Sequence, residues 1–155
     1  MAKVFRFRLD RVLEIRRVHE EMKKKELAQV RKAVSSQQGD ILQLLMKLDQ
    51  GKGVSRDLRR SSIDMTFLRM QEQYVNGLMR GIQKSYQVLQ GHVLEENKKK
   101  AELSEASKKV RVLERLREKK KAEYMVDLGR EEQKFLDEVA QNIERSKMQR
   151  GGAVS

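Results

Sequence analysis

The chain has 155 residues and contains no proline, cysteine or tryptophan; charged residues make up 37% of it and aromatic residues 5%. This composition excludes a rounded core with a catalytic pocket and leaves enough apolar residues for a narrow seam between helices. The formal net charge of +12 favours an acidic partner, either nucleic acid, an anionic membrane or an acidic protein surface. Because proline costs a helix interior about 3 kcal/mol, its absence permits helix along almost the whole chain.

The sequence also bears on location. A chain without cysteine has no disulfides and no thiolate metal sites, in agreement with a reducing cytoplasm. No apolar stretch follows the basic N-terminus, so we expect no signal peptide. No apolar run approaches the roughly 20 residues that cross a bilayer, so we expect no transmembrane segment.

A first helix is predicted over about residues 8–50. Apolar residues alternate there at spacings of three and four, which is the heptad seam of a coiled coil. The seam consists of Leu27, Val30, Val34, Gln37, Ile41, Leu44 and Leu48. Gln37 is its one polar member, and a polar residue in a seam can fix the register at some cost in stability.

The start of this helix carries a second apolar stripe. Its members, at steps of three, four and three, are Val12, Ile15, His19 and Met22. The stripe is out of phase with Leu27 by one residue. The pattern therefore predicts a local phase shift over residues 23–26.

Residues 51–62 read GKGVSRDLRRSS and are predicted to form the turn. Gly51 and Gly53 weaken a helix, and closely spaced serines are typical of turns. We expect Ser61 or Ser62 to cap the next helix, because a serine oxygen can accept a hydrogen bond from a free backbone N–H there.

A second helix is predicted over about residues 63–148, followed by a frayed tail at 149–155. Its apolar stripe is Phe67, Met70, Tyr74, Leu78, Ile82, Leu89, Leu103, Ala106, Val110, Leu113, Tyr124, Leu128, Phe135 and Val139. Gly77, Gly81 and Gly91 each cost about 1 kcal/mol relative to alanine. They predict a weak or bent stretch, or a division into two helices.

Two long helices joined by a short turn most simply run antiparallel. The predicted fold class is therefore all-α, a long antiparallel two-helix coiled-coil hairpin forming one domain over residues 1–155, with the second helix longer. A turn at 51–62 would place Leu9 opposite residue 103 or 104. Everything after about residue 105 would then overhang, and its apolar residues would form an exposed binding surface.

Charges are clustered along the second helix. Residues 98–121 hold eleven Lys/Arg and four Glu, whereas residues 122–139 hold two Lys/Arg and six Asp/Glu. A solvated coiled-coil face accounts for single charges, while the clustering favours a charged partner. A basic coiled coil that binds nucleic acid is the alternative of another class, but glutamates interleave with its basic residues and no aromatic face suits single strands.

Catalytic, cofactor and metal sites are not expected. The two histidines, His19 and His92, are isolated, and neither belongs to a metal-binding motif. The Gly51-Lys52-Gly53 tripeptide lacks the G-x-x-x-x-G-K-[ST] pattern of a phosphate loop. We therefore expect no enzymatic activity.

Both ends of the chain resemble the FliJ family of the bacterial flagellar type III export apparatus. The opening Phe5-Arg-Phe7-Arg-Leu9-Asp-Arg-Val12-Leu13-x-x-Arg16 is similar to the family's aromatic-x-aromatic-x-Leu followed by Val-Leu-x-x-Arg. Residues 113–124 (LERLREKKKAEY) are similar to its Leu-rich and Lys/Arg-rich segment ending in Tyr. Residues 131–138 (EEQKFLDE) are similar to its closing Glu-Gln and Leu-Asp-Glu. Residues 35–95 match only as coiled coil.

The resemblance implies a cytoplasmic stalk, similar to the central stalk of rotary ATPases and peripheral at the inner face of the cell membrane. Such a protein serves motility without hydrolysing anything: it engages the export ATPase ring, contacts the cytoplasmic domain of the export gate and escorts export chaperones. The partner-binding residues implied at the two ends are Phe5, Phe7, Leu9, Arg16, Leu116, Lys119, Lys120, Tyr124, Gln133, Leu136, Asp137 and Glu138. The alternatives are a stalk of a needle-type secretion system and a generic coiled-coil adaptor.

Overall fold

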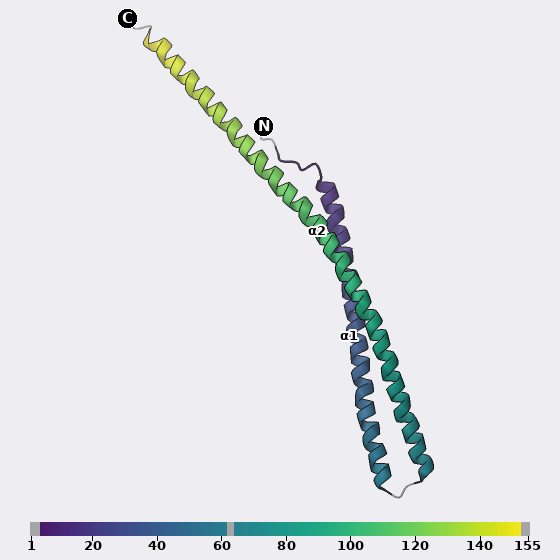
Figure 1. The fold of residues 1–155 in the computed structure, drawn as a ribbon. Coiled ribbons are helices and arrows are strands. Elements are labelled where there is room, and N and C mark those ends of the chain that lie inside the picture. Colours follow the sequence, from purple (N-terminus) through teal and green to yellow (C-terminus); the bar gives the residue numbers. More distant parts are fainter. Residues whose placement is uncertain (1–3, 62–63, 153–155) are drawn as a thin grey trace. The chain divides into compact units, whose positions relative to one another are not determined.

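The computed structural model describes residues 4–61 and 64–152, which form two helices, α1 (Asp10–Arg60) and α2 (Met65–Gly151) (Figure 1). Those two ranges contain no strand, so the all-α prediction is confirmed, as is the longer second helix, with 87 residues against 51. Contacts divide the chain into two units, described separately below. The hairpin unit comprises residues 18–107, and the terminal unit comprises residues 1–17 and 108–155.

In the hairpin unit, α1 and α2 run antiparallel and enclose the predicted seam (Figure 1). The seam residues of α1 that are buried or half-buried are Leu27, Val30, Val34, Gln37, Ile41, Leu44 and Leu48. The Nε2 of Gln37 donates a hydrogen bond across the seam to the carbonyl oxygen of Ser85 at 3.2 Å. A slipped register would leave this amide without its partner, so the bond favours one pairing of the helices.

The predicted turn at 51–62 is wrong, because α1 continues through both glycines to Arg60. Gly51 is the next seam position after Leu48, and a Cβ on it would lie 3.2 Å from Cγ2 of Val75. Its carbonyl oxygen accepts a hydrogen bond from Nε2 of Gln71 at 3.2 Å. Each glycine costs a helix about 1 kcal/mol, and packing against α2 outweighs that cost here.

The connection between the helices therefore lies at residues 61–64. Ser61 does not cap α2; its Oγ donates back to the carbonyl oxygen of Asp57 at 3.1 Å, at the end of α1. Ser62, the other predicted cap, lies outside the described residues. Asp64 caps α2 instead, since its Oδ1 accepts a hydrogen bond from the backbone N–H of Thr66 at 3.1 Å.

Moving the turn moves the register by about ten residues. The predicted turn would have placed Lys23 opposite roughly residue 90, but Lys23 pairs with Glu102. The seam at residues 27–48 accordingly packs against α2 between Val75 and Lys99, instead of residues 64–86.

The predicted phase shift over residues 23–26 is also wrong. Ile15, in the predicted stripe, is 68% exposed, whereas Leu13 is only 2% exposed. The heptad of Leu27 continues upstream without a break, through half-buried Lys23 and Glu20. The apolar pattern missed this phase because charged residues occupy those seam positions.

On α2, the predicted stripe fails before Leu78, holds from Leu78 to Leu128 and fails again at Phe135 and Val139, which are exposed. Phe67, Met70 and Tyr74 are exposed, and the seam there is formed by Leu68, Gln71 and Val75. From residue 78 onward, the predicted residues that are buried or half-buried are Leu78, Ile82, Leu89, Leu103, Ala106, Val110, Leu113, Tyr124 and Leu128. The glycines at 77, 81 and 91 do not interrupt the helix, which extends past residue 148 to Gly151. Of the predicted frayed tail, residues 153–155 lie outside the described part of the chain.

Two lysines and two glutamates link the helices beside the seam of the hairpin unit, close to Leu27. Lys23 Nζ lies 2.9 Å from Glu102 Oε2, and Lys99 Nζ lies 2.9 Å from Glu26 Oε2. The hydrogen bond from Lys23 holds the pKa of Glu102 below its ordinary value. Hydrogen bonds from Lys99 and then Lys23 do the same for the pKa of Glu26. Lys99 of the basic block and Lys23 of α1 are thus partly neutralised within the fold, which argues against a continuous nucleic-acid surface.

Candidate partner-binding site

The N-terminal segment before α1, residues 4–9, is not helical and packs against α2 in the terminal unit (Figure 1). Phe5, Phe7 and Leu9 are buried or half-buried, while Arg6 and Arg8 between them are exposed. The aromatic-x-aromatic-x-Leu spacing therefore places its three apolar residues on α2 and its two arginines toward solvent.

Phe5 and Phe7 anchor this segment. The ring of Phe5 lies 5.6 Å from that of Tyr124, centroid to centroid, at an interplanar angle of 46°. Phe7 is 8% exposed, and its carbonyl oxygen accepts a hydrogen bond from the N–H of Asp10 at 3.2 Å, where α1 begins. A tilted aromatic pair of this kind contributes about 0.5–1.5 kcal/mol beyond the area it buries.

A cavity of about 810 Å³ lies between the segment and α2. Its walls combine Phe5, Phe7 and Leu9 with Leu116, Lys120 and Tyr124 of α2. We call these six residues the aromatic platform. The structure thus brings together six of the residues predicted from the two ends of the sequence. Such a site suits an apolar side chain of a partner that also carries negative charge.

Arg6 and Arg8 also line the cavity, as does Val4, and sequence reasoning did not include them among the site residues. The signal was present in the alternation of the opening segment, where every second residue is basic. These arginines, with Lys120, give the rim of the aromatic platform a positive charge.

Ion pairs hold the start of α1 beside α2. Arg117 Nε lies 3.1 Å from Asp10 Oδ1, and Arg17 Nη2 lies 3.1 Å from Glu114 Oε1. Each is largely exposed and contributes at most about 1 kcal/mol. Because Asp10, at the start of α1, pairs with Arg117, the overhang does not begin at about residue 105 as predicted. Val110 is buried, Leu113 and Leu116 are half-buried, and α2 is exposed throughout only from residue 131 onward.

Arg16 and Lys119 belong to the same unit but do not line the cavity of the aromatic platform. Half-buried Arg16 lines a smaller cavity of about 300 Å³ with Val12 and Val112. Lys119 is exposed. Its neighbour Lys120 donates a hydrogen bond to Glu123 at 3.0 Å, and this bond holds the pKa of Glu123 below its ordinary value.

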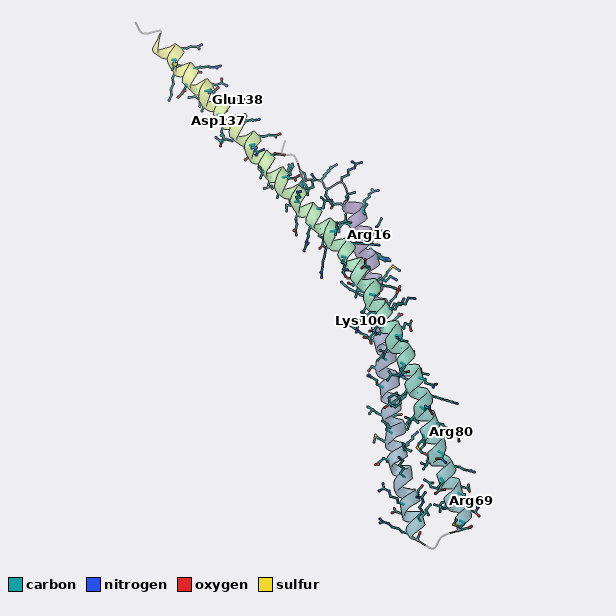
Figure 2. All side chains as sticks on the ribbon, viewed as in Figure 1. Arg16, Arg69, Arg80, Lys100, Asp137 and Glu138 are labelled. Atoms are coloured by element: carbon teal, nitrogen blue, oxygen red, sulfur yellow. The ribbon has the colours of Figure 1, made fainter. Side chains whose placement is uncertain are left out.

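The remaining predicted residues lie further along α2 and do not line the cavity of the aromatic platform; Figure 2 labels two of them, Asp137 and Glu138. Gln133 Nε2 donates to Asp137 Oδ1 at 3.0 Å, one turn away on the same helix. Leu136 and Glu138 are exposed, and Phe135 is 65% exposed. All residues of α2 from 131 to 151 are exposed, so this is a single helix with uncovered apolar side chains.

Within residues 4–61 and 64–152, no three His, Asp or Glu side chains are placed to hold a metal ion. No helix in the described part of the chain has the length and apolar character needed to cross a membrane.

Comparison with known families agrees with the two terminal motifs. A family profile described as Flagellar FliJ protein matches residues 5–149, which is nearly the whole chain. No curated protein and no solved structure matches the chain. The matched range includes the aromatic platform and the exposed part of α2 through Glu138. The chain therefore belongs to the FliJ family, whose members are components of the flagellar export apparatus.

Proposed function

We propose that this protein is a non-enzymatic coiled-coil stalk that engages the ring of the flagellar export ATPase. The aromatic platform is the observation that carries the proposal, since residues from both ends of the sequence meet there around a cavity of about 810 Å³. The cavity accepts an apolar side chain of the ring, and the arginines at its rim attract acidic residues around it.

The exposed part of α2 supplies the second contact. A single helix with its side chains is about 10–12 Å across, roughly half the width of a helix pair, and fits a narrower central opening. Phe135 and Leu136 are exposed on it beside Asp137 and Glu138. Apolar anchors flanked by charges are typical of specific interfaces. The terminal unit, rather than the part of the hairpin unit where α1 and α2 connect, would thus enter the ring.

The same proposal extends to the other partners implied by the family. The stalk would contact the cytoplasmic domain of the export gate and escort export chaperones, in the cytoplasm at the inner face of the cell membrane. It would hydrolyse nothing itself and would need no cofactor.

Binding of the purified protein to the export ATPase tests the platform. Tyr124→Ala removes the ring that packs on Phe5, and we expect roughly a tenfold or greater loss of affinity. Tyr86→Ala is the matched control, because Tyr86 is an exposed tyrosine of the hairpin unit. Equal affinity of both variants, with unchanged helicity, would refute the role of the aromatic platform.

Salt dependence tests the charged rim. Reversing the charge of Lys119, Lys120 and Lys121 should weaken ATPase binding more at low salt than at high salt, because ions screen such contacts. Tight binding of random duplex DNA at physiological salt, without ATPase binding, would favour the nucleic-acid alternative instead.

A further inference from the structure

The hairpin unit contains a second cavity, of about 470 Å³, that includes none of the partner-binding residues above. One wall is a face of α1 with Lys52, Arg56 and Arg59. The other is a face of α2 with Glu72 and Met79. The cavity lies near the ends of the two helices at Arg60 and Met65.

Small residues in the seam leave this space unfilled. Gly51 and Ser55 occupy two successive seam positions of α1, where the preceding positions hold Leu44 and Leu48. Val75 packs against Gly51 from α2 and also lines the cavity. Few side-chain atoms of α1 are therefore available to fill the groove at this level.

Ser55 is an unusual member of the cavity wall. It is 7% exposed, and its Oγ has no hydrogen-bond partner among the described residues. A buried hydroxyl without a partner destabilises a fold, and such groups are rare in native proteins. An oxygen atom of a bound ligand would supply the missing partner.

Cations surround the cavity with little compensation. Arg59 pairs with Glu72, the one carboxylate on the cavity wall. Lys52 and Arg56 form no ion pair with any described residue. The same face of α2 carries Arg69 and Arg80, seven residues before and four residues after a cavity residue, Asn76 (Figure 2). This face therefore has a clear excess of positive charge.

Apolar side chains accompany the cations. Met65 and Met79 are exposed. Each lies one heptad from Glu72, so all three residues share a face of α2. Uncovered apolar residues between Lys and Arg are typical of surfaces that bind at the interface of an anionic bilayer. Guanidinium groups also match the geometry of phosphate oxygens.

We propose that this face of the hairpin unit binds an anionic lipid surface, with one lipid phosphate in the cavity. The phosphate contacts Lys52 and Arg56 and accepts the hydrogen bond from Ser55 Oγ, while Met65 and Met79 contact the acyl region. A phosphate has enough oxygens to satisfy all three donors at once. This site adds a lipid contact to the proposed position at the membrane, and it uses none of the residues proposed for ATPase binding, so either can fail without the other.

Co-sedimentation with vesicles of phosphatidylglycerol and phosphatidylcholine tests the proposal. Changing Lys52, Arg56 and Arg69 together to Gln should lower the partition coefficient at least about tenfold at low salt. The matched control changes Lys25, Lys32 and Lys47 to Gln, which removes the same charge from exposed positions of the same unit. The control should lose much less affinity.

A second variant addresses Ser55. Ser55→Ala removes an unpaired buried hydroxyl, so it should raise the melting temperature of the free protein. It should also weaken vesicle binding by roughly threefold to tenfold, because the lipid phosphate loses a hydrogen bond. A mere packing role for Ser55 would leave vesicle binding unchanged.

Three outcomes would overturn the proposal. In the first, the wild-type protein binds anionic vesicles no better than vesicles of pure phosphatidylcholine. In the second, the site and control triple variants lose affinity equally, which indicates attraction by net charge alone. In the third, soluble poly-glutamate or inorganic phosphate binds through Lys52 and Arg56 while vesicles do not. ATPase binding by the site variant should stay at the wild-type level throughout.

Discussion

Matched substitutions at Gly51 and Gly53 test the most consequential departure from the sequence pattern, the continuation of α1 to Arg60. Both glycines lie inside α1, but their surroundings differ. A Cβ at Gly51 would lie 3.2 Å from Val75, whereas a Cβ at Gly53 would meet no atom within 4 Å. Leucine at the two positions should therefore have opposite effects.

The magnitudes follow from helix propensity and packing. Leucine is favoured over glycine in a helix by about 0.5–1 kcal/mol, so Gly53→Leu should raise the free energy of unfolding by that amount. Overpacking a seam costs about 1–3 kcal/mol, so Gly51→Leu should lower the free energy despite the same propensity gain. For a chain of this size, each kcal/mol moves the melting temperature by roughly 2–4 °C.

Thermal unfolding, followed by the helical signal in far-ultraviolet circular dichroism, compares both variants with the wild-type protein. A turn at residues 51–62 would make both substitutions destabilising, because leucine tolerates turn conformations poorly. Two downward shifts of similar size would therefore refute the helical continuation. Gly77→Leu, in α2 with open space around it, should behave like Gly53→Leu and serves as the control.

Four further predictions concern the seam and the two units. Ile41→Ala should cost about 2–4 kcal/mol in unfolding free energy, because Ile41 is buried in the narrow seam; a melt unchanged by this substitution would contradict the assignment. The pKa values of Glu26 and Glu102 are lowered in the folded protein. Their contribution to stability is therefore fully present above the unfolded-state pKa of about 4.3 and is lost as pH falls through the folded-state pKa values. Glu102→Gln should make the melting temperature depend less on pH in this acid range. The raised pKa of Lys23 predicts the mirror effect, with stability lost as pH rises through its folded-state value above 10.5. Truncation after residue 110 should leave the 27–48 seam helical, because its partners lie between Val75 and Lys99, but should abolish motility in a complementation assay; retained motility would defeat the proposed role of the missing part of α2.

Six residues of the candidate site could be predicted from the sequence, but only because the two terminal motifs resemble those of a known family. Phe5, Phe7 and Leu9 were expected to act with Leu116 and Tyr124 because of resemblance, and no spacing rule connects positions more than 100 residues apart. The alternation of the opening segment could have added Arg6 and Arg8, since each lies between two apolar residues that pack on α2. The cavity beside Ser55 had no such signal, because it depends on which residues of α2 face Gly51.

The sequence by itself determined the helices and the central seam. The absence of proline and the three-four spacing from Leu27 to Leu48 are properties of neighbouring residues. Such properties are enough to predict a helix and the face that it buries. Gln37 was identifiable for the same reason, as the one polar residue in that spacing.

Only the tertiary structure decided where the chain turns and which residues meet. A glycine weakens an isolated helix, yet Gly51 is helical because Val75 and Gln71 of α2 pack and hydrogen-bond there. Glu20 and Lys23 belong to the seam because both have hydrogen-bond partners across it. Ser107 Oγ donates to the Glu20 carboxylate, and Lys23 Nζ donates to the Glu102 carboxylate. Both outcomes depend on contacts between segments far apart in the chain, whose free energies local propensity does not contain.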